Sequence, residues 1–164
     1  MTLRLRRVVT GHDSSGKAIV TIDEVARNIV STRSGVSTCV AWTSEGFPVD
    51  NNGEADEALR KTGTTHDNGT VFRIIEFAPG NAGRNHRTDS IDYACVLSGE
   101  IDMDLDGANV HLKAGDVIVI PAGVGHWFTK IDDHIRYLMV RIDPDKVTPL
   151  KDEAAAKADL ARAK

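Results

Sequence analysis

Hydrophobic and polar residues alternate along much of the chain, and this alternation predicts short β-strands. The clearest case is EIDMDL at positions 100–105, where the apolar residues would lie on one face of a strand and the acidic residues on the other. Asp106 and Gly107 form a typical hairpin turn. Residues 109–112 return as the partner strand, with His111 opposite in parity to its apolar neighbours. We therefore expect His111 on the solvent face.

Further strands are expected in segments that are rich in β-branched and apolar residues and bounded by turn residues. These segments are 3–10, 17–22, 34–43, 70–77, 95–97, 117–121 and 134–142. The run VIVIP at 117–121 is apolar throughout, so we expect that strand to be buried on both faces. Eight or more short strands with regular turns predict an all-β fold, either an antiparallel barrel or a sandwich.

The segment 44–68 interrupts this pattern, since it is long, polar and rich in Asp, Asn, Gly and Glu. One helical turn is expected at 54–60, and His66 is expected to be exposed, as is His12 in an earlier turn. The segment is either a solvated acidic loop or a functional lid or dimer contact, because loops of this length in compact domains are often functional. Beyond residue 143, strong helix formers such as DEAAAKADLARAK predict a short C-terminal helical tail.

Composition narrows the class of protein. The chain has 164 residues, which fits one domain with a proper core. We divide it into N-terminal strands and a polar loop (1–68), a barrel core (69–143) and a tail (144–164). The net charge of −4 gives no indication of the positively charged surface that binds nucleic acid. No apolar run approaches the roughly 20 residues of a membrane span, and MTLRLRRVV lacks the core of a signal peptide. We expect a cytoplasmic protein that binds neither nucleic acid nor membrane.

Cys39 and Cys95 both lie in apolar, strand-like runs. We interpret them as two buried free thiols, and a disulfide or a catalytic cysteine is the alternative.

Two glycine-bounded stretches carry the candidate chemistry. The first, 80–99, reads GNAGRNHRTDSIDYACVLSG, and the second, 115–130, reads GDVIVIPAGVGHWFTK. Side chains alternate faces along a strand, so an unbroken strand would place His86, Thr88, Ser90 and Asp92 on one face. His126 would join them if the second stretch lies across the same barrel. Two imidazoles and one carboxylate would leave coordination positions open on a metal ion, as catalytic sites require.

The spacing in these stretches resembles the two motifs of the cupin family. Gly80, His86 and Gly99 match the first motif, with Thr88 in place of its second histidine and Asp92 in place of its glutamate. Four residues match the second motif, whose final asparagine is replaced by lysine: Gly115, Pro121, Gly123 and His126.

The resemblance implies a jelly-roll barrel, also called a double-stranded β-helix. It also implies one divalent metal ion (Fe, Mn, Zn or Ni) bound by His86, Asp92 and His126. Asp92 could instead hydrogen-bond a ligating imidazole or move a proton as a catalytic residue. We expect Thr88 and Trp127 to line the substrate pocket. Cupins commonly form dimers, and the N-terminal strands are candidates for a homodimer interface.

The same resemblance leaves more than one function open. A metal-dependent enzyme could act on a small carbonyl or phenolic molecule as a Lewis acid, which covers isomerase, cyclase, dehydratase and decarboxylase chemistry. Two imidazoles and a carboxylate also resemble the site of non-haem iron dioxygenases. The third alternative is a non-catalytic cupin that binds a small molecule.

Overall fold

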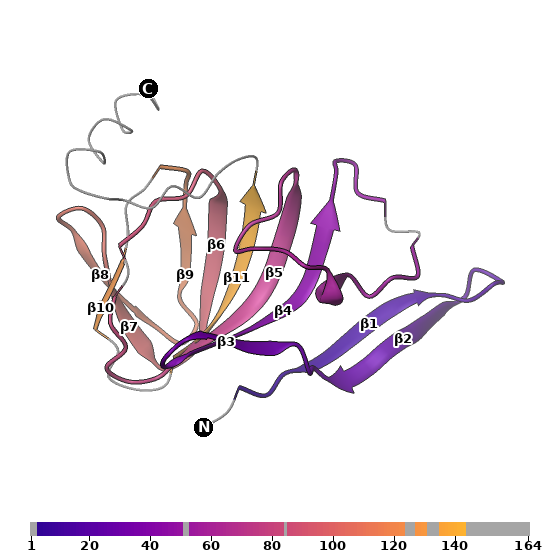
Figure 1. Ribbon diagram of the computed structural model, residues 1–164, viewed down its shortest axis with the longest axis horizontal. Helices are drawn as coiled ribbons and strands as arrows, with labels where there is room; N and C mark the ends of the chain where they lie inside the picture. The colour runs from indigo at the N-terminus through magenta and orange to yellow at the C-terminus, as the bar shows by residue number, and fades with distance from the viewer. Residues whose placement is uncertain (1–2, 51–52, 84, 124–126, 131–134, 144–164) are drawn as a thin grey trace.

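The computed structural model describes residues 3–50, 53–83, 85–123, 127–130 and 135–143, and it describes the last two ranges by their backbone alone (Figure 1). The strands are β1 (Arg6–His12), β2 (Ala18–Val25), β3 (Ile29–Arg33), β4 (Val36–Glu45), β5 (Gly69–Phe77), β6 (Ile91–Ser98), β7 (Glu100–Asp104), β8 (Asn109–Lys113), β9 (Val117–Ile120), β10 (Trp127–Lys130) and β11 (Ile135–Asp143). A 3-10 turn, η1 (Glu57–Leu59), lies in the long polar segment. The all-β prediction is confirmed.

Two sheets face each other across the main core (Figure 1). The larger sheet has the strand order β3-β4-β5-β11-β6-β9, and the smaller one has the order β10-β7-β8. The pairs within these two sheets are antiparallel. The sheet runs across the division at residue 68 that we drew from the sequence, because β4 pairs with β5 along its length.

The main core is built by alternate residues of facing strands. Ile75 and Phe77 of β5 meet Ile101 and Met103 of β7, and all four are buried. The hydrophobic effect, acting through burial of apolar side chains from both sheets, is the main force that holds such a sandwich together. The alternation predicted for 100–105 is therefore confirmed.

The β7–β8 hairpin also has the predicted turn. Asp106 and Gly107 both have positive φ, 50° and 110°, which is the left-handed conformation that a tight hairpin turn requires. His111 lies on the exposed face of β8, where its Nδ1 is 2.6 Å from a carboxylate oxygen of Asp102. The expected orientation of His111 is confirmed.

A second cluster covers the outer face of the larger sheet. Leu3 and Ala26 pack there against Cys39 of β4 and Ile74 of β5. The β5 strand is thus buried on both faces, which explains its nearly continuous apolar sequence. The β1–β2 hairpin projects away from the barrel beyond this cluster (Figure 1).

The prediction that the apolar run after Gly115 is buried on both faces is wrong. In β9, Ile120 is buried, whereas Val117 is 66% exposed and Val119 is 51% exposed. The second cluster covers the outer face at β4 and β5, whereas β9 lies at the other edge of the larger sheet and none of its residues belongs to that cluster.

The two cysteines are both free, as expected. Cys39 is buried, and burial raises the pKa of its thiol. Cys95 is only half-buried, so the expectation of two buried thiols holds for Cys39 alone. A raised pKa keeps a thiol protonated and unreactive, which argues against nucleophilic chemistry at Cys39.

Candidate functional site

The candidate site begins on the inner face of β6. Asp92 lies on the same face of this strand as Ala94 and Val96, two residues of the main core. Its side chain is fully buried (0% exposed). Side chains two residues apart lie on the same face of a strand, so Asp92 points into the barrel with the core residues. A carboxylate is thereby placed in an apolar interior, where an ionised group requires compensating partners.

Two more polar residues extend this inner face before the strand begins. The hydroxyl of Ser90 donates to Oδ1 of Asp92 at 2.8 Å, and the hydroxyl of Thr88 lies 3.5 Å from the Ser90 carbonyl oxygen. Both residues are buried. The parity predicted from the sequence therefore holds from Thr88 to Asp92, although regular strand pairing starts only at Ile91.

His86 lies before this segment and is half-buried. Between it and Thr88, Arg87 breaks the predicted alternation, because its side chain is buried too. The reason is that Arg87 reaches another segment of the chain and donates to the carbonyl oxygen of Gly123. The amide of Gly123 in turn donates to the Thr88 carbonyl at 2.8 Å. The two motif stretches, far apart in sequence, are thus adjacent in space.

The register of the sheet shows which end of the barrel these residues occupy. Asp92 lies opposite Arg141 of β11, and Arg141 lies opposite Val71 of β5. Because β5 and β6 both run antiparallel to β11, the beginnings of β5 and β6 are at the same end. The segment between β4 and β5 lies at this end, where the Thr43 hydroxyl donates to the Glu57 carbonyl at 2.7 Å.

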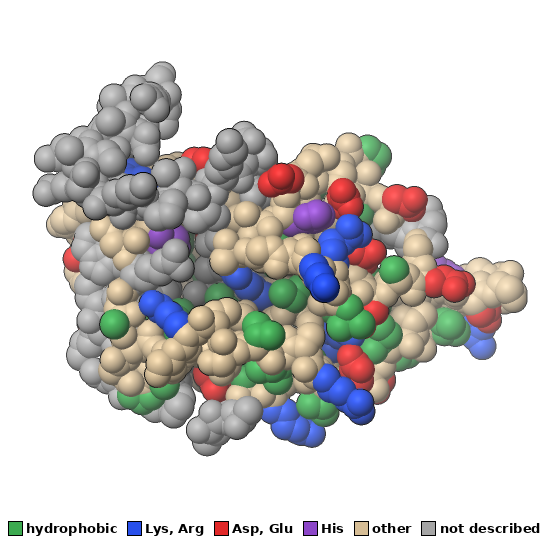
Figure 2. Space-filling model, viewed as in Figure 1, with side chains coloured by type: hydrophobic (Ala, Val, Ile, Leu, Met, Phe, Trp, Pro, Cys, Tyr) green, Lys and Arg blue, Asp and Glu red, His purple; other side chains and the backbone are tan. Residues whose placement is uncertain are grey.

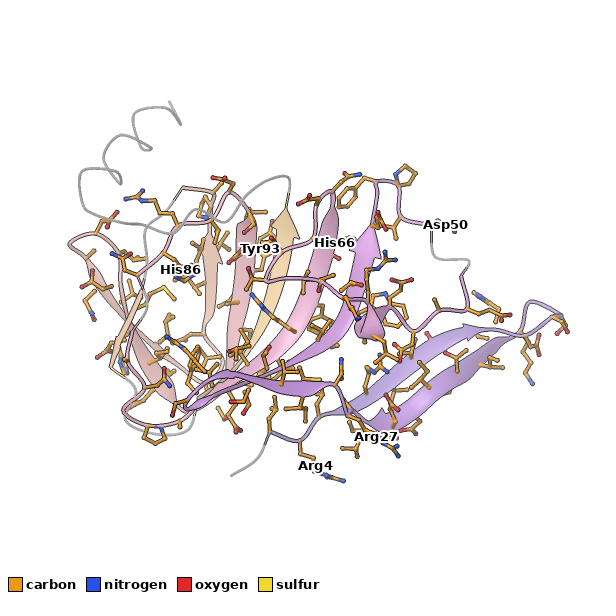
Figure 3. The ribbon with its side chains drawn as sticks, viewed as in Figure 1. Arg4, Arg27, Asp50, His66, His86 and Tyr93 are labelled. Atoms are coloured by element: carbon orange, nitrogen blue, oxygen red, sulfur yellow. The ribbon has the colours of Figure 1, made fainter. Side chains whose placement is uncertain are left out.

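His66 belongs to this segment, and the expectation that it is exposed is wrong. Its side chain is 19% exposed, and Nε2 lies 3.8 Å from a carboxylate oxygen of Glu45. The ring is held against Gly69, since a methyl group at Gly69 would come within 2.6 Å of His66 Cδ2. Figure 3 shows His66 on the side of β4 and β5, whereas His86 lies on the side of β7 and β8.

Charged side chains surround His66 on the exposed face of the molecule. Arg60 bridges Glu45 and Glu57 at 2.7 and 2.6 Å. Figure 2 shows a histidine side chain beside acidic and basic side chains on this face. Some of the charged residues in and beside this segment thus form ion pairs with one another and are not simply solvated.

The predicted metal ligands stand as follows. The side chain of Asp92 is buried inside the barrel, and His86 is half-buried just before residues 88–92. His126 lies outside the described residues. The side chain of Trp127 also lies outside them. Among residues up to 123, where side chains are described, no group of three or more His, Cys, Asp or Glu side chains could hold a metal ion. The three-ligand centre therefore stays a prediction that depends on His126.

The donor types on the described part of the site fit a divalent cation. Asp92 supplies a carboxylate and His86 an imidazole, which together suit Fe, Mn and Zn. Ser90 places its hydroxyl group beside that carboxylate, and the Thr88 hydroxyl lies near the Ser90 carbonyl oxygen. A hydroxyl group placed like that of Ser90 can orient a carboxylate that binds a metal ion.

The sequence placed Ser90 on the same face as Asp92 but did not predict its hydrogen bond to that carboxylate, and it gave no role to Arg87. Arg87 carries no comparable signal, because strand alternation places it on the outer face. Its contact with Gly123 depends on a fold that brings distant segments together.

A family model described as "Cupin domain" matches residues 73–141. Among curated proteins, "Phomopsin biosynthesis cluster protein C'" of Diaporthe leptostromiformis is 35% identical over 123 residues, which are 69% of this chain and 64% of that protein. The "Cupin-domain-containing oxidoreductase fogC" of Aspergillus ruber is 33% identical over 130 residues, covering 76% of this chain and 64% of that protein. The chain therefore spans less than two thirds of these relatives.

Among solved structures, KdgF from Halomonas sp. superposes with a TM-score of 0.52 at 13% identity, covering 71% of this chain and 89% of that chain. This likeness concerns the fold alone. No helix among the described residues is long and apolar enough to cross a membrane.

Proposed function

The chain belongs to the cupin superfamily, and on this premise we propose that it is a metal-dependent enzyme acting on a small organic molecule inside the barrel. One observation carries the proposal: a fully buried carboxylate, Asp92, faces the barrel interior in the position that the first motif gives to a metal ligand. An apolar residue there would often be at least as stabilising, because burying a carboxylate costs desolvation free energy even when it is hydrogen-bonded.

The metal ion would be held by His86, Asp92 and His126. When bound, it would act as an electrophile that polarises a carbonyl or enolate oxygen of the substrate. Its identity would follow from the donors: a carboxylate with imidazoles favours iron or manganese, and zinc and nickel accept the same set.

The chain's own residues would bind the substrate and move the proton. Thr88 and Trp127 are proposed to line the pocket, with Thr88 supplying a buried hydroxyl. Asp92 is buried on the same inner face as Thr88, and the Ser90 hydroxyl donates to one of its oxygens. A carboxylate held in this way can take a proton from a carbon next to a carbonyl group and return it elsewhere. Isomerase, cyclase and dehydratase reactions can use this proton removal, whereas a decarboxylase releases CO2 and uses only the return of a proton to the resulting enolate.

A second candidate is an oxidation of the same class of substrate. The observation that favours it is the similarity to a protein named a cupin-domain-containing oxidoreductase, at 33% identity. A ligand set of two imidazoles and one carboxylate is also typical of non-haem iron oxygenases. The relative named for a biosynthesis cluster supports a small organic substrate in either case.

Turnover of β-dicarbonyl and phenolic compounds, measured with and without oxygen in the Fe(II)-, Mn(II)- and Zn(II)-loaded protein, tests the proposal. We expect equal turnover without oxygen and with zinc. Strict dependence on oxygen and iron would establish the oxidation instead. Tight binding of these compounds with no turnover under any condition would leave a non-catalytic binding protein.

A further inference from the structure

Arg87 is a buried cation that joins three segments of the chain. Its side chain is 4% exposed, and Nη2 lies 2.7 Å from Oδ2 of Asp106 in the β7–β8 turn. Nη1 donates to the carbonyl oxygen of Gly123, which precedes His126 by three residues in the sequence. Arg87 itself follows His86 directly. The guanidinium therefore links the two motif stretches to each other and to the smaller sheet.

The two stretches are tied in both directions at this point. Besides accepting from Arg87, Gly123 donates its amide proton to the Thr88 carbonyl at 2.8 Å. A planar guanidinium with several donors can hold two acceptors in fixed directions at once, which neither lysine nor an apolar residue can do. The contacts thus fix the separation and orientation of residues 86–88 relative to the turn at Gly123.

This arrangement is unfavourable for a residue whose only role is to fill space. Nε of Arg87 is buried and has no hydrogen-bond partner among the described residues. A buried polar group without a partner destabilises a protein, and an apolar residue of similar volume would avoid this cost. The buried Nε of Arg7 also lacks a partner among the described residues, so it is the two contacts of Arg87 with Gly123 and Asp106 that single this residue out.

We propose that Arg87 is a positioning residue that holds the two ligand-bearing stretches in register, with Asp106 as its counter-ion. The proposal rests on the proposed function, because His86 and His126 are the ligands that it would position. Asp106 has a second effect here: it offsets a positive charge that would otherwise oppose a cation in the nearby site. Removing either partner would loosen the Gly123 turn and weaken metal binding.

The variants that test this are Arg87→Met, which removes the donors, Arg87→Lys, which keeps the charge, and Asp106→Asn. Asparagine tolerates the positive φ of position 106, so Asp106→Asn should keep the turn and the fold. This variant therefore still tests the proposal if Arg87→Met proves unstable. Matched controls come from an Arg–Asp pair in the β1–β2 hairpin, Arg6 and Asp23, joined at 2.8 Å but exposed. The control variants are Arg6→Met and Asp23→Asn.

The first measurement uses the metal-free protein. Hydrogen exchange of the amide of Gly123 should accelerate at least about 10-fold in Arg87→Met and Asp106→Asn, with Arg87→Lys in between, and stay unchanged in the controls. The second measurement is the affinity for Mn(II) and Zn(II) by competition with a chromophoric chelator. Loss of a residue that orients a metal ligand typically costs about 10- to 100-fold, and we expect a loss in this range.

The outcomes separate this proposal from the proposed function. Unchanged exchange at Gly123 would overturn the positioning role whether or not metal binds. Faster exchange with unchanged metal affinity would also overturn it, because the contact would then not serve the ligands. If the unsubstituted protein binds no metal while the exchange effect is present, the metal-dependent function fails and the role of Arg87 in holding the two stretches together is retained. A less than additive loss of affinity in the double variant Arg87→Met/Asp106→Asn is expected, since both act through one contact.

Discussion

Asp92 is the residue that we propose as both the metal ligand and the proton carrier. Its carboxylate is fully buried, faces the core and accepts a hydrogen bond from Ser90. A second carboxylate, Asp89, lies three residues earlier in the same segment but is exposed. The pair therefore offers a direct comparison between a carboxylate inside the barrel and one outside it.

We predict that Asp92→Asn lowers metal affinity by at least about 10-fold and removes most turnover, because a neutral amide is a poor ligand and no base. The fold should persist, since asparagine has nearly the same shape and avoids a buried charge. Metal titration and turnover assays measure both effects, with Asp89→Asn as the control. Metal binding in Asp92→Asn equal to that of the control would contradict the assignment.

A different carboxylate, Asp56, serves stability. It accepts hydrogen bonds from the buried guanidinium of Arg7, and its carboxylate also caps η1 by accepting from the Ala58 amide. Arg7 holds the pKa of Asp56 below its ordinary value, whereas burial acts in the opposite direction. The unfolded chain therefore binds a proton at Asp56 at a higher pH than the folded protein does.

It follows that this contribution to stability is complete above the unfolded pKa of about 3.9 and is lost as the pH falls through the lowered folded pKa. Asp56→Asn should reduce the free energy of unfolding at pH 7 by about 2 kcal/mol. Because asparagine is also a good N-cap, the loss would reflect the charge. Urea unfolding at pH 7 and pH 3 should show the difference shrinking in acid. An equal difference at both values would contradict this account, and Asp23→Asn in the exposed pair should change little.

At the scale of elements, local patterns predicted most strands, and the errors have physical causes. The β7–β8 hairpin follows its alternation and its turn residues, so it could be predicted in full. The exposure of Val117 in β9 could not be predicted, because an apolar sequence does not indicate whether other residues pack over the strand's outer face. The strand β3 was not predicted, since its exposed middle residues give no core face to recognise.

In the candidate site, too, local patterns predicted some residues, and contacts between distant segments determined the others. His86 and Asp92 were found from motif spacing, and the burial of Asp92 agrees with its parity. Arg87 and the half-buried His66 were not, because their positions depend on contacts between distant segments. His66 is placed by the way the loop meets the beginning of β5, and neither its type nor its neighbours in sequence indicate that contact.

The beginning of β5 gives a test at this scale. A methyl group at Gly69 would lie 2.1 Å from the Ser44 carbonyl oxygen and 2.6 Å from His66 Cδ2. Gly69→Ala should therefore destabilise the protein by about 1–3 kcal/mol, as overpacking does. Gly63→Ala is the matched control, because its methyl group would meet only an ordinary contact at 3.8 Å. Equal unfolding midpoints for the two variants in urea would show that the loop does not pack on β5 in this way.

On the scale of the whole molecule, the β1–β2 hairpin projects from the barrel and is tied to it at Arg7, whose side chain hydrogen-bonds Asp56 (Figure 1). Val8, Val20 and Val25 are exposed on it. A two-stranded hairpin is at best marginally stable by itself in water, so an arm of this kind gains from a further contact. We propose a second copy of the chain as its partner, since twofold dimers are the commonest closed assemblies.

Light scattering at micromolar concentration should then give the mass of a dimer. Val8→Glu and Val20→Glu should shift the protein towards the monomer, because a charge would be buried in the contact. Val119→Glu on the exposed face of β9 is the control and should leave the mass unchanged. A monomer mass for the unsubstituted protein at all concentrations would rule out the dimer.

The central claim is that the barrel brings residues from two distant stretches together around one divalent ion. Its most direct test is the number of metal ions bound per chain after equilibrium dialysis against Mn(II), Fe(II) or Zn(II), in the unsubstituted protein and in His86→Ala and His126→Ala. The account predicts one ion per chain in the unsubstituted protein and a loss of at least about 10-fold in affinity in each variant. Full occupancy in both variants would contradict it, since the ion would then be bound elsewhere.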